Sequence, residues 1–178
     1  MKKAVVEAEA YAPVEDVYAL IEDFEGYGDF SEYVNDIRVF DDGENPEWEI
    51  EFRWWIVSYT ARSKVLDQEE NEYIEWRLTK DVDVAGRWEF VELDDEHTRL
   101  ELHLWYDPMG AYKANPLRYF PTKRLMQITK PVAHRHMRTV LRRVAEELEG
   151  EPRDVDFTIR AEETDHDEDH FLYMMSGS

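Results

Sequence analysis

The clearest pattern in the chain is an alternation of apolar and charged residues between positions 47 and 54. Trp48, Ile50, Phe52 and Trp54 fall on one side of this segment, and three glutamates and an arginine fall on the other. Successive side chains point to opposite faces of a strand. The pattern therefore predicts an antiparallel strand with one apolar face and one face in water.

Similar patterns before and after this segment predict a largely antiparallel sheet. The expected strands cover residues 3–11, 37–40, 47–54, 58–66, 73–78, 86–93 and 98–106, with turns at 68–72 and 94–97. Trp76, Trp88 and Phe90 fall on the apolar sides of their strands. A sheet with one apolar face needs a helical cover, which the remaining segments supply.

Helical spacing appears at both ends of this strand region. Pro13 fits a first helical turn, and Val14, Val17, Tyr18, Ile21 and Phe24 follow at helical intervals. Near the other end, residues 122–130 are predicted as a short helix. A separate long helix is expected to open at Pro131 and to stop at Gly150. Its apolar stripe comprises Ala133, Met137, Val140, Leu141, Val144 and Leu148.

This order of elements predicts an α+β fold in one domain, residues 1–150. Residues 151–178 form an acidic C-terminal extension, for which we expect one added strand and then a mobile tail. An apolar hook, Phe171–Met175, ends that tail and offers a docking segment for the domain or for a second copy.

Charge changes the expectations about partners. The chain has 178 residues, with 42 Asp and Glu against 21 Lys and Arg, and a formal net charge of −21. Such a surface repels phosphates, so no nucleic-acid partner is expected. Pervasive acidity with few lysines is typical of a salt-adapted cytoplasm, where salt screens the repulsion. The alternative explanation is an acidic face that binds a cationic partner. No apolar run long enough to form a transmembrane segment and no secretory signal is recognised.

Motifs for enzymatic chemistry are scarce. The chain has no cysteine, and we find no phosphate-binding, dinucleotide or nucleophile-elbow motif. His134 and His136 are two residues apart on a helix, which is the wrong spacing for a helical zinc pair, so we expect no metal and no cofactor. The best guesses for an acid–base group are His136 and Tyr106, and the catalytic residues stay unknown. Tyr59 is a candidate for orienting a ligand carbonyl.

The segment Ala12–Tyr33 resembles the opening of START-like (SRPBCC) proteins, and within them the polyketide cyclase/dehydrase and coenzyme-Q-binding group. Tyr59-Thr60-Ala61-Arg62, Trp88-Glu89-Phe90 and Thr98-Arg99-Leu100 follow in the order expected of that family. The resemblance covers about residues 3–149. It implies a helix-grip fold, in which a curved antiparallel sheet wraps around a long C-terminal helix and encloses a pocket for lipids, quinones or polyketides.

We therefore predict a hydrophobic ligand site between the aromatic face of the sheet and the long helix. Its expected residues are Trp48, Phe52, Trp54, Tyr59, Trp76, Trp88, Phe90, Tyr106, His136, Met137, Val140, Leu141 and Val144. The alternative is that the aromatic residues simply close the core. Binding or transport of a hydrophobic small molecule is the first function hypothesis, and a polyketide cyclase or dehydrase using the same cavity is the second. The third is an interaction module built on the tail hook. The expected assembly is a monomer or a homodimer.

Overall fold

A computed structural model of the protein describes residues 2–41, 46–54, 57–80, 83–106 and 122–162. The elements are β1 (Lys2–Ala10), α1 (Val14–Glu22), a 3-10 turn (Phe24–Gly26), α2 (Tyr27–Phe30), β2 (Val34–Asp41), β3 (Glu47–Trp54), β4 (Val57–Glu69), β5 (Tyr73–Leu78), β6 (Val84–Asp94), β7 (His97–Tyr106), α4 (Thr122–Glu149) and β8 (Phe157–Glu162).

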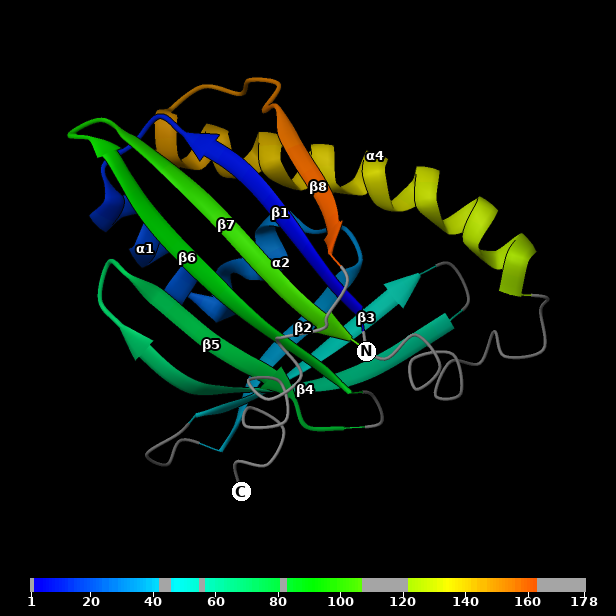
Figure 1. Ribbon diagram of the computed structural model, residues 1–178. Helices are drawn as coiled ribbons and strands as arrows, with labels where there is room; N and C mark the ends of the chain where they lie inside the picture. The colour runs from blue at the N-terminus through cyan, green and yellow to red at the C-terminus, as the bar shows by residue number, and fades with distance from the viewer. Residues whose placement is uncertain (1, 42–45, 55–56, 81–82, 107–121, 163–178) are drawn as a thin grey trace.

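The strands form one 8-stranded sheet in the order β2-β3-β4-β5-β6-β7-β1-β8. All of the neighbouring strands pair antiparallel, and β1 lies between β7 and β8. The sheet is strongly twisted, and α1, α2 and α4 lie on the same side of it (Figure 1). These features confirm the predicted α+β class, with a curved antiparallel sheet and a long C-terminal helix. We call the helix-covered side of the sheet the inner face and the opposite side the outer face.

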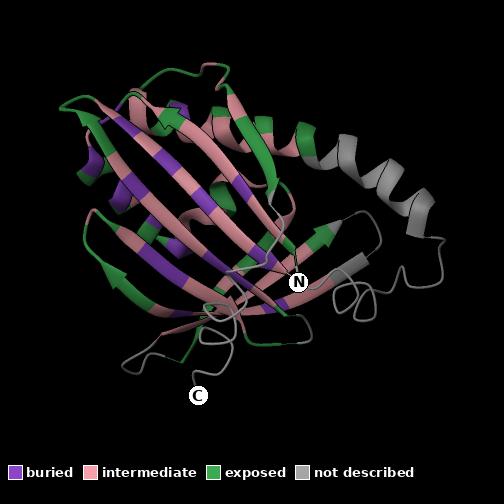
Figure 2. Ribbon diagram, viewed as in Figure 1, coloured by how far each residue is buried: buried purple, intermediate pink, exposed green. Residues whose placement is uncertain are grey.

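The hydrophobic core lies between α1 and the middle strands. Val17, Tyr18 and Ile21 of α1 are buried together with Ile74 of β5 and Phe90 of β6. Buried and partly buried positions alternate along much of β7, as expected of a strand with one face in the core (Figure 2). The core therefore occupies the end of the inner face that α1 covers.

The C-terminal helix differs from the prediction at Pro131. A single helix, α4, runs from Thr122 to Glu149, so the expected separation into helices 122–130 and 131–149 is wrong. An internal proline costs one backbone hydrogen bond and about 3 kcal/mol, and a long helix can carry that cost when its other bonds remain. The predicted stop is confirmed, since Gly150 has φ 80° and its N–H donates to the carbonyl of Glu146 at 3.0 Å.

The segment after α4 returns to the sheet. In β8, Ile159 lies opposite Val6 of β1, which makes β8 an edge strand. The division of the chain at residue 150 stays a prediction. The hook Phe171–Met175 lies outside the described residues. Within the described residues, no helix is long and apolar enough to cross a membrane.

Candidate functional site

The strand registers show which of the predicted site residues share a face. Directly opposite residues in an antiparallel pair lie on the same face. Phe52 lies opposite Tyr59, and Trp76 lies opposite Gly86. By this register the inner face carries Trp48, Phe52, Trp54, Tyr59, Trp76, Trp88, Phe90 and Tyr106. The side chain of Trp54 lies outside the described part of the structure.

At the α1 end of the inner face, aromatic residues pack into the core. The ring centroids of Trp48 and Phe24 are 4.8 Å apart, and those of Phe90 and Tyr18 are 5.2 Å apart. Trp88 is partly buried against the same cluster. For these three predicted site residues the structure shows core packing, so a ligand surface would lie at the other end of the inner face.

The cavity that α4 forms with α1 and β1 is small. It has a volume of about 30 Å³ and is lined mainly by apolar side chains, including Val17, Ile21, Leu100, Leu141 and Val144. That is room for about one water molecule, whereas ligand pockets usually span roughly 300–1,000 Å³. Leu141 and Val144 therefore face a nearly closed part of the interior, and a ligand needs space elsewhere along the inner face.

Two larger depressions lie at the margins of the sheet. One has a volume of about 410 Å³, with Phe24, Trp48 and Gln68 among its lining residues. The other, about 440 Å³, includes Tyr11 and Arg153 beside the β1–β8 edge. Of the predicted site residues, only Trp48 is among those that line these depressions.

His136 joins α4 to the segment between α2 and β2. Its Nε2 lies 3.1 Å from Oγ of Ser31, and its ring centroid is 4.3 Å from that of Tyr33. Its Nδ1 is buried and has no hydrogen-bond partner. Burial lowers the pKa of His136, the positive charge of Arg143 lowers it further, and Glu32 opposes the shift. The lowered pKa favours the neutral imidazole, with Nε2 beside Ser31 and Nδ1 buried.

Trp76 is a second polar group without a partner on the inner face. Its indole Nε1 is buried and makes no hydrogen bond. Its ring lies over Gly86 so closely that a Cβ built on that glycine would be 2.3 Å from Cζ2 of the indole. Trp76 does not belong to the core clusters found among the described residues. The glycine therefore makes room for an indole outside the core.

Other predicted site residues lie on β4, β7 and α4. The Tyr59 hydroxyl donates to the carbonyl of Lys80 at 3.3 Å, so it already has an acceptor. Tyr106 ends β7 opposite Val84 of β6, and its side chain is half-buried. Met137 and Val140 are half-buried positions of α4.

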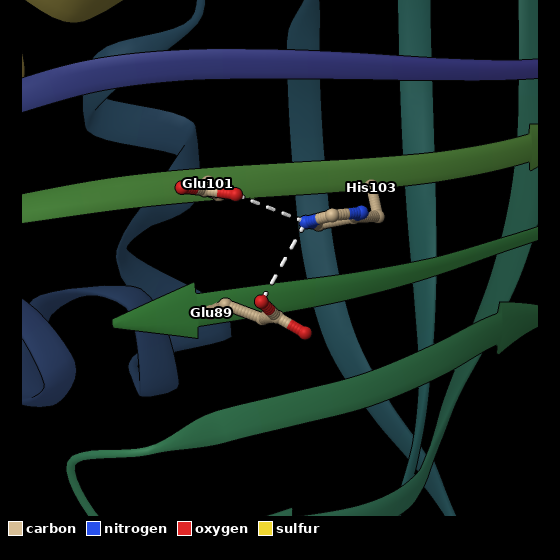
Figure 3. Close-up of side chains that lie close together, drawn as sticks. All are labelled: Glu89, Glu101 and His103. Atoms are coloured by element: carbon tan, nitrogen blue, oxygen red, sulfur yellow. Dashed lines mark hydrogen bonds and ion pairs between the residues drawn. The ribbon is translucent and has the colours of Figure 1, made fainter. Parts of the chain in front are cut away.

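The outer face carries a polar cluster that the sequence analysis did not find (Figure 3). Nε2 of His103 lies 3.3 Å from Oε2 of Glu101 and 3.6 Å from Oε2 of Glu89. These three residues could together hold a cation. The two carboxylates are paired, however, since Nε of Arg87 is 2.8 Å from Glu89 and Nε of Arg99 is 3.5 Å from Glu101. We interpret the cluster as an ion-pair network. Strand parity puts all three residues on the outward side of their strands, but their approach depends on the register that sets Glu89 opposite Glu101.

Comparison with known proteins places these features in a family. Residues 11–149 match the family model described as polyketide cyclase / dehydrase and lipid transport. The chain belongs to this family. The match confirms the resemblance seen in the sequence. A search of curated protein sequences finds no match.

Solved structures with low sequence identity show the same fold. The chain is 19% identical to the Zhui aromatase/cyclase of Streptomyces sp. R1128, with a TM-score of 0.65 over 84% of this chain and 94% of that one. A START superfamily protein of Mycobacterium smegmatis is 16% identical, with a TM-score of 0.60 over 84% and 99% of the two chains. The di-domain aromatase/cyclase BexL is 15% identical, with a TM-score of 0.61 over 84% of this chain and 50% of that one. These likenesses confirm the helix-grip, START-like fold.

Proposed function

We propose that this member of the polyketide cyclase/dehydrase family binds a hydrophobic small molecule between the inner face and α4, and thereby stores or transports it. One observation carries the proposal. The inner face continues beyond the core, and there it presents Phe52, Tyr59 and Trp76, which lie outside the core clusters of the described residues. Apolar surface of this kind gains about 25 cal/mol for each Å² that a ligand removes from water.

Other residues of the predicted site have supporting roles in this proposal. Met137, Val140, Leu141 and Val144 of α4 would cover the ligand, and Tyr106 would border it. Trp48, Trp88 and Phe90 would support the site mainly from the core. From the charge of the chain we further propose that the protein works in a salt-adapted cytoplasm and has no nucleic-acid partner. We propose separately that it is a monomer or a homodimer.

Binding of a neutral hydrophobic dye tests the proposal. Nile red should show saturable binding with increased fluorescence, and Phe52→Glu should weaken that binding about tenfold or more because it places a charge on an apolar surface. The matched control is Phe40→Glu, the same change at a side chain that is 52% exposed and lies against the Arg62 guanidinium. We expect the control to bind within about twofold of the wild type. Absence of saturable binding, or equal effects of the two variants, would refute the proposal.

A cyclase or dehydrase acting in the same cavity is the second candidate. The observation that favours it is the Ser31–His136 pair, since a neutral imidazole can act as a general base on an acidic C–H or O–H group. A poly-β-ketone chain should then be converted to a ring with a new ultraviolet absorbance, and His136→Gln should abolish the conversion. An unchanged rate in that variant would remove this candidate.

A further inference from the structure

The outer face of the sheet carries an apolar patch that is buried although none of the described helices covers it. Ala85 of β6 and Trp105 of β7 lie directly opposite each other, and strand parity places both on the outer face. They are 0% and 3% exposed, and the partly buried Leu66 of β4 packs against them. The helices α1, α2 and α4 all lie on the other side of the sheet (Figure 1). We call Leu66, Ala85 and Trp105 the outer patch.

The described neighbours of Trp105 explain only part of its burial. The side chain of Ala85 is too small to cover an aromatic ring system, which has about 150–250 Å² to bury. Nζ of Lys3 lies 5.3 Å from the centroid of the indole, and the ring centroid of His103 lies 6.1 Å from it. These residues flank the indole on the sheet surface, from which side chains stand roughly perpendicular. The low exposure of Trp105 therefore calls for a further segment above the outer patch.

We propose that the apolar hook of the same chain, Phe171–Met175, docks on the outer patch. The hook offers five consecutive apolar residues and lies outside the described residues. Docking makes the C-terminal extension part of the domain, in place of the mobile tail that its charge run predicts. The inference concerns the outer face, so it is independent of the ligand proposed for the inner face.

The path of the chain favours this hook as the cover. The last residue of β8, Glu162, lies opposite Lys3 of β1, and Lys3 lies opposite Trp105 of β7. The chain therefore leaves the sheet in the same register row as the outer patch and two strands away from Trp105, a distance of about 10 Å. Phe171 follows Glu162 by nine positions, and a chain of that length can span up to roughly 30 Å. The hook can thus reach the patch while β8 stays in the sheet.

Charge along this row complements the segment that precedes the hook. Beyond the outer patch the row continues to Arg77 of β5 and Lys64 of β4. With Lys3 it carries three cationic side chains against one acid, Glu162, in a chain whose net charge is −21. Residues 165–170 contain four acids, which this row attracts. Salt screens that attraction, whereas burial of the apolar hook gains free energy at any salt concentration.

A spin label beside the hook tests the contact in the full chain. The protein has no cysteine, so Ser176→Cys provides a single attachment point for a nitroxide directly after the hook. The nitroxide should remove most of the intensity of the Trp105 indole N–H resonance in a ¹H–¹⁵N spectrum, and its reduction by ascorbate should restore that intensity. The resonance is assigned by its loss in Trp105→Phe.

Two control proteins make the result specific. Asp95 is exposed in the turn between β6 and β7, ten positions from Trp105, which is about 33 Å along a strand. A nitroxide on Asp95→Cys should therefore leave the Trp105 resonance unchanged. In the labelled Ser176→Cys protein, adding Phe171→Glu and Leu172→Glu puts two charges into the hook and should restore most of the Trp105 intensity. The resonance of Ile74, a core residue, should keep its position and so report an intact fold.

A mixing experiment identifies the chain that supplies the hook. Nitroxide-labelled protein without ¹⁵N is mixed with ¹⁵N-labelled protein that carries no nitroxide, and docking within one chain predicts an unchanged Trp105 resonance. Broadening in the mixture would assign the outer patch to the hook of a second copy and overturn docking within the chain. A Trp105 resonance that the Ser176→Cys label leaves unaffected, or broadening that survives the two glutamates, would show that the hook is not the cover. The Nile red test of the proposed function is unaffected by any of these outcomes.

Discussion

The close approach of Trp76 to Gly86 makes a sharp prediction for Gly86→Ala. These residues lie directly opposite each other in β5 and β6. The new Cβ would be 2.3 Å from Cζ2, 2.5 Å from Cε2 and 2.9 Å from Nε1 of the Trp76 indole. Real Cβ atoms do not approach ring atoms so closely, so the indole must move away from its place on the inner face.

The expected cost combines two opposing effects. Overpacking of this kind costs about 1–3 kcal/mol. Replacing glycine by alanine inside a strand returns roughly 0.5–1 kcal/mol of backbone entropy. The middle of the two ranges gives a net loss of about 1.3 kcal/mol in the free energy of unfolding for Gly86→Ala. For a chain of this size that lowers the melting temperature by roughly 3–5 °C.

Urea denaturation followed by circular dichroism measures this change. Gly28→Ala is the matched control, because Gly28 is exposed in α2 and a new Cβ there would be 4.0 Å from the nearest atom, Cγ1 of Val34. The control should be neutral or slightly stabilising. Adding Trp76→Leu to Gly86→Ala should remove the clash, and the double-mutant cycle should give a coupling of about 1 kcal/mol or more. A Gly86→Ala protein as stable as the wild type, with an unshifted Trp76 indole resonance, would refute the reasoning.

Three further predictions concern other contacts. Burial lowers the pKa of His136 below 6.5, so just below pH 6.5 the unfolded chain binds more protons than the folded one and this group lowers the stability of the fold. His136→Phe should therefore gain stability relative to the wild type as the pH falls from above 6.5 to about 5. Parallel pH profiles of the two proteins would contradict this. Arg87→Met should lower the free energy of unfolding in urea by about 3 kcal/mol, because Nη1 of Arg87 is 2.6 Å from the carboxylate of Glu75, whose side chain is 6% exposed. A loss no larger than that of an ordinary surface substitution would argue against a structural ion pair. Gly150→Ala should cost about 1 kcal/mol, since Gly150 has φ 80°, and an unchanged melting temperature would count against the left-handed helix stop.

Local patterns were enough to predict the sheet and its faces. Alternation along residues 47–54 correctly separated the inner residues from the outer ones, because a strand has a side-chain period of two. Arg62 illustrates the outer side, where its Nε lies 3.2 Å from Oε2 of Glu49. The same reasoning could not tell which inner aromatics fill the core, because parity identifies a face and says nothing of what packs against it.

The features that matter most for the site depend on contacts between distant segments. Ser31 and His136 are 105 positions apart, and their approach follows from how α4 crosses the α2–β2 segment. The place of Trp76 over Gly86 depends on the register between β5 and β6, which no local pattern reveals. Pro131 misled the prediction of α4 for the opposite reason, because a strong local signal was outweighed by the rest of the helix.

Native mass spectrometry of the full chain, purified at high salt and exchanged as gently as it tolerates, tests the central claim most directly. The account predicts a reproducible adduct that solvent extraction releases as an apolar small molecule, or that forms on adding Nile red. An unliganded protein that also takes up no Nile red when the dye is in excess would contradict it.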